Sequence, residues 1–183
     1  MDSSRFMMDA LDYNEVSKCK LCPHLGLDHV PSEGAMDADL MLVGNQPNLH
    51  EIKAKRPIAG KSGDLLSYML AELPLGREDV YIANLLKCRP GKDCRGTNEE
   101  NKTCFNAWLK EEFRLVKPKV TVFLGRDVWT ATPAKWKPKH GKVIKTNMAG
   151  TIIYWYHPSY YLQRGNVGGF MKLAGIIDRE LNK

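Results

Sequence analysis

Four short apolar runs limit the folds open to this chain more than any other feature of its sequence. They cover residues 39–43, 80–86, 120–124 and 151–156, and glycine or polar residues follow each of them. Runs of this length that end in turn residues are typical of strands buried on both faces. We therefore expect four buried β-strands.

The segments between these runs have the periodicity of amphipathic helices. Residues 63–73 place their leucines and one methionine on a single face. Thr97 and Glu100 have the spacing of a capping box, which predicts the start of another helix. The apolar stripe of that helix consists of Phe105, Leu109, Phe113 and Val116. Two more helices are predicted over residues 126–131 and 169–181. Strands that alternate with helices indicate an α/β fold with a mostly parallel sheet covered on both faces.

Chain length and composition favour one domain over residues 1–183. A chain of this length can bury most of its apolar surface in a single core. Hydrophobic residues make up 43% and charged residues 26%, which argues against disorder along the whole chain. No apolar run approaches the roughly 18 residues of a membrane helix, and residues 1–5 show no secretory signal. We expect an intracellular protein of the cytoplasm, or of the host cytoplasm if the protein is viral.

The excess of basic residues permits a polyanionic partner. Lys and Arg number 27 against 21 Asp and Glu, so the net charge is +6 and the pI is near 9.0. A basic loop between the third and fourth apolar runs contains Lys135, Lys137, Lys139, His140, Lys142 and Lys145. Such a loop can bind phosphates in a salt-dependent way, and a solvated lysine-rich loop is the alternative.

Polar segments follow three of the four predicted strands. They are residues 44–48 (GNQPN), Asn84 with the loop to Pro90, and residues 157–159 (HPS). In open parallel sheets, ligands bind outside the carboxyl ends of the strands. The sequence therefore predicts a ligand site at that edge of the sheet.

Five cysteines indicate a metal site. In a reducing compartment, clustered cysteines point to metal binding or catalysis more than to disulfides. Cys19 and Cys22 form a C-x2-C pair, and together with Cys88 and Cys104 they can close a four-thiolate site. Zinc and iron–sulfur clusters share these ligands, and buried cysteines without a metal are the third possibility. Cys94 can replace Cys88 or Cys104, or stay free.

These motifs together resemble the family 4 uracil-DNA glycosylases, the iron–sulfur type of their superfamily. The family pattern G-E-x-P-G stands here as residues 44–48, with Glu51 at the later acidic position. The pattern G-R-P-F-V-G-x-x-G-x-L-L stands as residues 55–66 (KRPIAGKSGDLL). Y-I-x-N-x-x-K-C-R-P is nearly verbatim at residues 81–90, and H-P-S occupies residues 157–159. The order and the spacing of the motifs match the family.

The resemblance implies a fold, a cofactor and a function. The fold is a three-layer αβα sandwich around a four-stranded, mostly parallel sheet. The cofactor is a structural [4Fe–4S] cluster, with zinc as the alternative, on Cys19, Cys22, Cys88 and Cys104. The function is hydrolysis of the N-glycosidic bond of uracil, or of a 5-substituted uracil, flipped out of DNA in base excision repair. DNA is the expected partner of a monomeric chain, and replication or repair proteins are candidate partners.

The resemblance also implies roles for individual residues. Those at the reaction centre are Asn45 and His157, those that bind the base are Gln46, Ile58 and Asn84, and those that contact the DNA backbone are Lys61, Ser62, Ser159 and Arg164. The Asn84 amide can donate to uracil O4 and accept from N3–H, and His157 can donate to O2, where negative charge grows. The alternatives are an asparagine that caps a loop, a histidine held in a turn, and ordinary surface residues.

Two departures from the family pattern bear on catalysis. The family's catalytic Glu is Asn45 here, and an amide cannot act as a carboxylate base, although it can hold a water. Ile58 replaces an aromatic residue that stacks on the base, and such stacking is worth roughly 1–3 kcal/mol. Two further hypotheses follow: a DNA-binding or accessory protein with impaired or lost catalysis, and a zinc-stabilised α/β domain of unrelated function.

Overall fold

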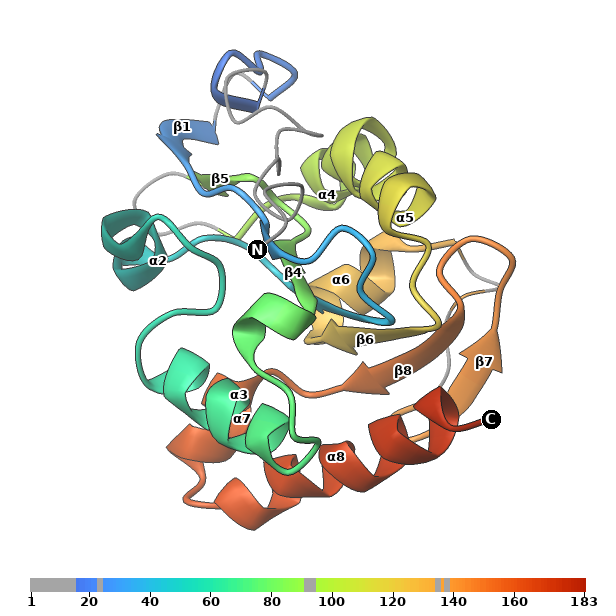
Figure 1. Ribbon diagram of the computed structural model, residues 1–183. Coiled ribbons are helices and arrows are strands. Elements are labelled where there is room, and N and C mark those ends of the chain that lie inside the picture. Colours follow the sequence, from blue (N-terminus) through green and yellow to red (C-terminus); the bar gives the residue numbers. More distant parts are fainter. Residues whose placement is uncertain (1–15, 23–24, 91–94, 134–135, 137–138) are drawn as a thin grey trace, which may run out of the picture.

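A six-stranded sheet forms the centre of the molecule (Figure 1). The computed structural model describes residues 16–22, 25–90, 95–133, 136 and 139–183. The strand order is β2-β4-β3-β6-β8-β7. The strands are β2 (Glu33–Gly34), β3 (Leu40–Gly44), β4 (Tyr81–Asn84), β6 (Val120–Leu124), β7 (Val143–Lys145) and β8 (Thr151–Trp155).

The four strands predicted from the apolar runs are confirmed, and they form the parallel part of the sheet. β4, β3, β6 and β8 pair in parallel, in that order. The expected number of strands is too low, because β2 and β7 add antiparallel edges to β4 and β8. β2 has two half-buried residues and β7 has three exposed or half-buried ones. Neither edge strand needs an apolar run, so hydrophobicity did not reveal them.

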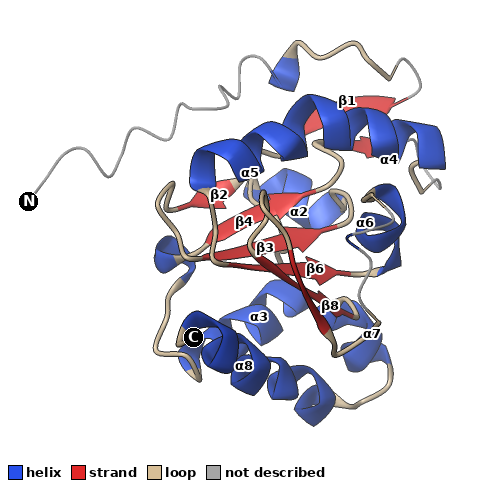
Figure 2. Ribbon diagram, turned by 90° about the vertical axis from the view of Figure 1, so that its right-hand side faces the viewer, coloured by secondary structure: helices blue, strands red, loops and turns tan. Residues whose placement is uncertain are grey.

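Helices cover both faces of this sheet, as the α/β prediction requires. Figure 2 shows α3 (Lys61–Ala71), α7 (Pro158–Gln163) and α8 (Val167–Leu181) on one face. On the opposite face lie α4 (Asn98–Cys104), α5 (Lys110–Val116) and α6 (Arg126–Ala131). The short helices α2 (Leu49–Ala54) and η2 (Arg77–Asp79) precede α3 and β4, respectively. A three-layer αβα sandwich results.

The central strands contribute to two separate cores. Leu40 and Leu42 of β3 lie in the core under α3 and α8, and Met41 and Val43 lie in the core under α4 and α5. Successive side chains of a strand point to opposite faces, and both faces are covered here. A central strand therefore has to be apolar throughout, and all five residues of β3 are buried.

The predicted capping box opens the longest helical stretch on the α4–α5 face. Thr97 accepts the N–H of Glu100, and the Glu100 carboxylate accepts the N–H of Thr97. The stretch continues from α4 through a π-helical turn (Phe105–Leu109) into α5. Its predicted stripe is buried at all four positions: Phe105, Leu109, Phe113 and Val116. Lys117 ends it with a left-handed C-cap.

A second, two-stranded sheet pairs β1 (Leu25–His29) with β5 (Cys88–Pro90). β5 follows β4 closely, so this small sheet sits beside the edge at which β4 ends (Figure 1).

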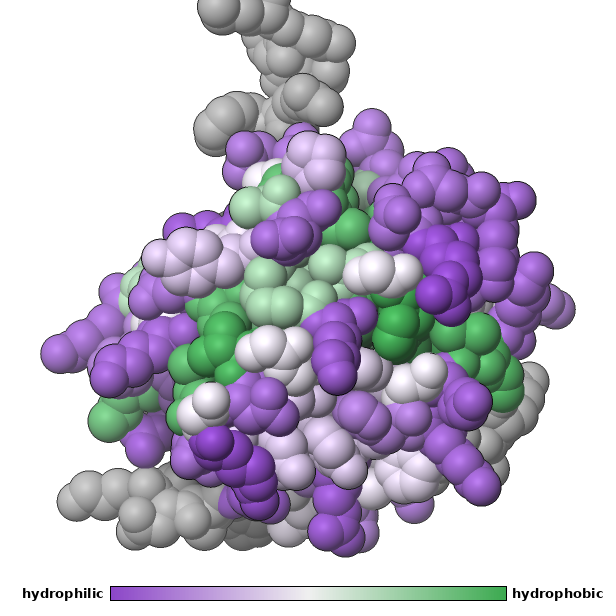
Figure 3. Space-filling model, turned by 90° about the horizontal axis from the view of Figure 1, so that it is seen from below, coloured by the Kyte–Doolittle hydropathy of each residue, from purple (hydrophilic) through white to green (hydrophobic). Residues whose placement is uncertain are grey.

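Figure 3 looks onto the α3–α8 side, where apolar areas lie among polar ones. The partly buried apolar residues of that layer include Leu73, Leu75, Met171, Ile176 and Leu181. Within the described residues, every helix is too short or too polar to cross a membrane.

Candidate active site

The carboxyl ends of the parallel strands bring together the three polar segments predicted to form a site. Asn84 ends β4, Asn45 follows β3, and His157 follows β8 by two residues. The ends are level, since Gly44 pairs with Asn84 and Leu124 with Trp155. Residues far apart in the sequence thus line a single edge of the sheet.

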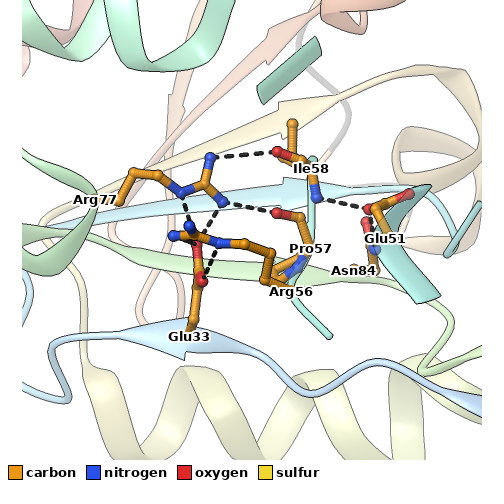
Figure 4. Close-up of polar contacts among 7 residues, drawn as sticks. All are labelled: Glu33, Glu51, Arg56, Pro57, Ile58, Arg77 and Asn84. Carbon is orange, nitrogen blue, oxygen red and sulfur yellow. Dashed lines mark hydrogen bonds and ion pairs between the residues drawn. The ribbon is translucent and has the colours of Figure 1, made fainter. Parts of the chain in front are cut away.

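The amide of Asn84 is buried and its orientation is fixed. The side chain is 3% exposed, and its Nδ2 donates to Oε1 of Glu51 at 2.9 Å (Figure 4). A carboxylate can only accept, so the NH2 group must be the end that faces Glu51. The amide oxygen then lies over Gly44, where an added Cβ would come within 2.4 Å of Oδ1. Glycine at position 44 leaves room for this oxygen.

Glu51 is the residue that organises this part of the site. Its Oε1 accepts from the Ile58 N–H at 2.6 Å as well as from Asn84, and its Oε2 accepts from the Asn48 N–H at 2.8 Å. Burial raises the pKa of the Glu51 carboxyl, and the three N–H donors and Arg77 oppose that rise. Both oxygens are engaged by N–H groups, so Glu51 positions Asn84 and is poorly placed to activate a water.

Ile58, predicted to contact the base, lies beside the side-chain amide of Asn84. Its side chain is 2% exposed. Cγ1 and Cδ1 lie 3.4 and 3.5 Å from the position that a Cβ at Gly44 would take, the same point that Asn84 Oδ1 approaches. Ile58 and Asn84 therefore border the same small space at the end of β3.

Asn45 uses its amide oxygen to cap a neighbouring helix. Oδ1 accepts the N–H of Val128 in the first turn of α6 at 3.2 Å. Gly125, the N-cap of α6, has a φ of +116° and approaches closely, because an added Cβ would lie 2.9 Å from both Nδ2 and Oδ1. The half-buried Asn45 thus sits against the positive end of a helix, a feature that its sequence position did not reveal.

Gln46, the other predicted base-binding amide, turns towards the segment before α4. Its Oε1 accepts the N–H of Gly96 at 3.1 Å. This bond ties the loop after β3 to the start of the helix that carries Cys104. The geometry gives Gln46 a structural contact, and its contact with a base stays a prediction.

His157 is held as a neutral ring with its proton on Nε2. Its Nδ1 accepts the backbone N–H of Ser159 at 3.3 Å and lies 2.8 Å from Ser159 Oγ. Because a backbone N–H can only donate, Nδ1 must be unprotonated, and the proton of the neutral ring belongs to Nε2. Loss of hydration lowers the pKa of His157 from 6.5 to about 4. The ring is therefore a neutral hydrogen-bond donor at neutral pH.

Three of the four predicted phosphate contacts lie in the first turns of two helices, and Arg164 lies at the end of the second. Lys61 and Ser62 form the first turn of α3, whose N-cap Gly60 provides no side-chain hydrogen bond. The N–H groups of such a turn favour anions. Ser159 is the second residue of α7 and already bonds His157. Arg164, just after α7, is exposed and places Cζ 3.9 Å from the centre of the Tyr160 ring.

A stack of aromatic rings links the basic loop to the segment after β8. The His140 ring stacks on Trp155 and on Tyr156 with centroid distances of 4.3 Å, and Tyr156 stacks on Tyr160 at 4.4 Å. His140 also lies 3.3 Å from the Tyr161 hydroxyl. Burial lowers the pKa of His140. Lys139, next to His140 in the sequence, is exposed, whereas Lys135 and Lys137 lie outside the described residues.

The four predicted metal ligands gather near the small sheet. Cys88 begins β5, Cys104 ends α4, and Cys19 and Cys22 lie in the described N-terminal segment. Burial raises the pKa of the Cys88 and Cys104 thiols to about 12, and for Cys88 the thiols of Cys104, Cys22 and Cys19 add to the rise. Crowded, desolvated thiols of this kind become stable thiolates when a metal supplies positive charge.

This set of donors fits a cluster with four thiolate ligands. In the described part of the chain, no three His, Cys, Asp or Glu side chains lie close enough to hold a single metal ion without rearrangement. Cys94 lies outside the described residues.

Comparison with known proteins places this geometry in a family. Residues 31–173 match the family described as the uracil DNA glycosylase superfamily. A type-4 uracil-DNA glycosylase of Thermotoga maritima is 36% identical over 159 residues, which cover 81% of this chain and 80% of that protein. The type-4 enzyme of Sulfurisphaera tokodaii is 38% identical, with coverages of 96% and 84%. That of Archaeoglobus fulgidus is 33% identical, with coverages of 86% and 85%.

Fold and site thus define an α/β protein with a ligand site at the carboxyl edge of a parallel sheet. The matches extend over most of the chain and include every element that builds this edge. The chain belongs to the uracil-DNA glycosylase superfamily, and within it to the type-4 family.

Proposed function

We propose that this protein is a uracil-DNA glycosylase that hydrolyses the N-glycosidic bond of uracil extruded from DNA. One observation carries the proposal: a buried amide with fixed orientation, Asn84, lies at the same sheet edge as a neutral histidine donor, His157. The similar type-4 enzymes bear the name of this activity. An enzyme that removes an extruded base needs a side chain that forms hydrogen bonds with the edge of the base. It also needs a hydrogen-bond donor at the oxygen on which negative charge develops.

Asn84 reads the base. Its Oδ1 is an acceptor for uracil N3–H, and the second Nδ2 hydrogen, beyond the one given to Glu51, is a donor for O4. Cytosine presents a lone pair at N3 and an amino group at position 4, so both contacts become repulsive. Because Glu51 prevents the amide from rotating, Asn84 cannot adapt to cytosine.

His157 stabilises the leaving group. When the bond between C1′ and N1 breaks, its electron pair goes to the uracil ring and negative charge spreads to O2. The Nε2–H of a neutral His157 can donate a hydrogen bond to that oxygen without a net charge of its own. The sugar becomes positively charged, a water adds to C1′ and loses a proton, and the products are uracil and an abasic site.

Asn45 holds the attacking water and does not deprotonate it. Its Oδ1 has a second lone pair beyond the one given to Val128, and a water can donate to it. An amide at this position cannot supply the negative charge that a carboxylate would lend to the sugar. The proposed enzyme is therefore slower than a relative with a carboxylate at this position.

The DNA backbone is held by the first turns of α3 and α7 and by the residue after α7. The open N–H groups of α3, with Lys61 and Ser62, suit one phosphate. Ser159 and Arg164 suit phosphates on the other side of His157. In this proposal the extruded nucleotide lies next to Asn84, close to the first turns of α3 and α7.

Cys19, Cys22, Cys88 and Cys104 hold a [4Fe–4S] cluster that acts as a structural tie. Held by the thiolates of these four cysteines, the cluster would join the N-terminal segment to β5 and α4 and would supply cross-linking iron–sulfur bonds rather than a step of base removal. Anaerobically purified protein is expected to be brown, and Cys88→Ser to lose the visible absorption together with thermal stability. Colourless protein that contains zinc would assign these thiolates to zinc.

The decisive experiment measures release of the base. Single- and double-stranded oligonucleotides with one uracil are incubated with excess protein, and abasic sites are detected by alkaline cleavage. The expected result is cleavage at uracil, with 5-substituted uracils tested in parallel, and its loss in Asn84→Asp. No abasic product with any of these bases at high protein excess would leave a DNA-binding protein without glycosylase activity.

A further inference from the structure

The backbone of Ile58 has an unusual conformation, and charged side chains hold it from two sides (Figure 4). Its φ of +48° lies in the left-handed region, which is strained for a β-branched residue. On one side Glu51 accepts the Ile58 N–H at 2.6 Å. On the other side Arg77 donates from Nη2 to the Pro57 carbonyl at 2.7 Å and from Nη1 to the Ile58 carbonyl at 3.2 Å.

Arg77 is itself held by an acidic residue of the edge strand. Its Nε donates to Glu33 Oε1 at 2.7 Å, and its Nη2 bonds the same oxygen. The two side chains are 14% and 22% exposed, so water screens this pair only in part. Arg56 reaches the other oxygen of Glu33 at 2.9 Å, but its side chain is 45% exposed. Arg56 therefore shares the carboxylate without holding the carbonyl groups of the loop.

The position of Ile58 matters because its side chain borders the side-chain amide of Asn84. Ile58 and Asn84 Oδ1 approach the same point above Gly44. Helix α3 packs closely against the backbone of Ile58, since a Cβ at Gly63 would lie 2.4 Å from the Ile58 carbonyl oxygen. A pyrimidine that forms hydrogen bonds with Asn84 therefore has to pack against the side chain of Ile58.

We propose that Arg77 is a positioning residue for base selectivity and that it acts through Ile58. The proposal rests on the proposed function, because it concerns which base the same site accepts. While Arg77 holds the two carbonyl groups, Ile58 is a fixed wall that excludes a pyrimidine larger than uracil. Without Arg77 the strained residue relaxes, the Ile58 side chain is free to move, and the site discriminates less strongly against thymine.

The test compares Arg77→Met with Arg56→Met, its matched control on the same carboxylate. Binding is measured to oligonucleotides that carry one 2′-fluoro-2′-deoxyuridine or one 2′-fluorothymidine, which resist hydrolysis. Arg77→Met is expected to lower the preference for uracil about tenfold, as expected when one methyl group is no longer rejected. Arg56→Met is expected to keep the preference of the wild type. Arg77→Lys, which keeps the charge but has no guanidinium to hold both carbonyl groups, replaces Arg77→Met if that variant does not fold, and it should lower the preference for uracil in the same direction.

A double mutant separates selectivity from general loosening. Glycine tolerates a positive φ and removes the wall, so Ile58→Gly alone should lower the preference by a similar factor. Arg77→Met should then cause no further loss in the Ile58→Gly background, because both changes act on one wall. Independent, multiplying effects would overturn the proposal, as would an Arg77→Met variant that is less heat-stable yet fully selective. Because the analogues are not cleaved, a wild type without glycosylase activity would refute the proposed function and leave this test intact.

Discussion

At the scale of single residues, the site depends on what holds each polar side chain. Asn84 and Asn45 have the same functional group and follow neighbouring strands, yet Glu51 orients the first and the start of α6 orients the second. The Glu51 carboxylate fixes the orientation of the Asn84 amide, as the proposed recognition of the base requires. A helix N-terminus places Asn45 in positive potential, which is a better environment for an anion than for an amide.

Replacing Asn45 by the carboxylate of the same shape should raise the rate of uracil excision. Asn45→Asp keeps the acceptor for Val128 N–H, and the first turn of α6 favours its ionised form. The negative charge then stabilises the sugar cation, and the single-turnover rate should rise about tenfold or more. Asn45→Ala is the control and should be slower than the wild type. A rate for Asn45→Asp no higher than that of the alanine variant would contradict the assigned position.

The pKa of His157 predicts how stability depends on pH. In the unfolded chain the ring takes up a proton at about 6.5, whereas burial holds it neutral in the folded protein down to about 4. Between these values the unfolded state binds more protons, so the folded state loses stability as the pH falls, at about 1 kcal/mol per pH unit. Urea denaturation at pH 7 and pH 5 measures this loss. His157→Asn should show a smaller difference, and an equal one would assign the effect to other groups.

At the scale of secondary-structure elements, local sequence signals decided where helices begin and the sheet decided what they cover. The Thr97 capping box, the continuous apolar strands and the stripe from Phe105 to Val116 were all readable from the sequence. The edge strands β2 and β7 were not, because pairing with a neighbour defines them more than their own composition does.

The N-cap of α4 offers a test at this scale. Thr97→Ala removes the acceptor for the Glu100 N–H and should destabilise the protein by about 0.5–2 kcal/mol. Thr97→Ser keeps the hydroxyl and should retain most of the stability. Because α4 carries Cys104, the alanine variant should also lose the proposed metal centre more readily on heating, measured by visible absorption. Equal melting temperatures for all three proteins would show that this cap contributes nothing.

At the scale of the whole molecule, one buried ion pair joins parts of the chain that are distant in sequence. Lys87 Nζ lies 2.7 and 2.6 Å from the two oxygens of Glu112, and the side chains are 4% and 2% exposed. Tyr81 and Ser32 donate to the same carboxylate. The pair connects the end of β4, next to Cys88, with α5.

Breaking this pair on one side should be much worse than removing both partners. Lys87→Met leaves Glu112 buried without its cation and should cost about 3–5 kcal/mol. Adding Glu112→Leu removes the unpaired charge, so the double variant should recover a large part of that loss. Chemical denaturation of the three proteins gives the comparison. A double variant that is less stable than Lys87→Met would contradict the assignment of the loss to an uncompensated charge.

The sequence by itself determined the parallel strands, the longer helices and the edge of the sheet at which Asn45, Asn84 and His157 would lie, whereas the short helices α2 and α7 were not predicted. These features follow from local periodicity and from the rule that parallel strands end at one edge. The ligand spacing of the cysteines likewise needs only the order of residues.

Only the tertiary structure decided which partner each polar group has. Arg77 carries no motif, and its acceptors Glu33, Pro57 and Ile58 come from distant segments that meet after the sheet has formed. The same holds for the bond of Asn45 to α6, whereas the contact that fixes the His157 tautomer is local, with Ser159 two residues further on. Hydrogen bonds depend on distances of a fraction of an ångström between side chains, and residue order sets no such distance until the chain is packed.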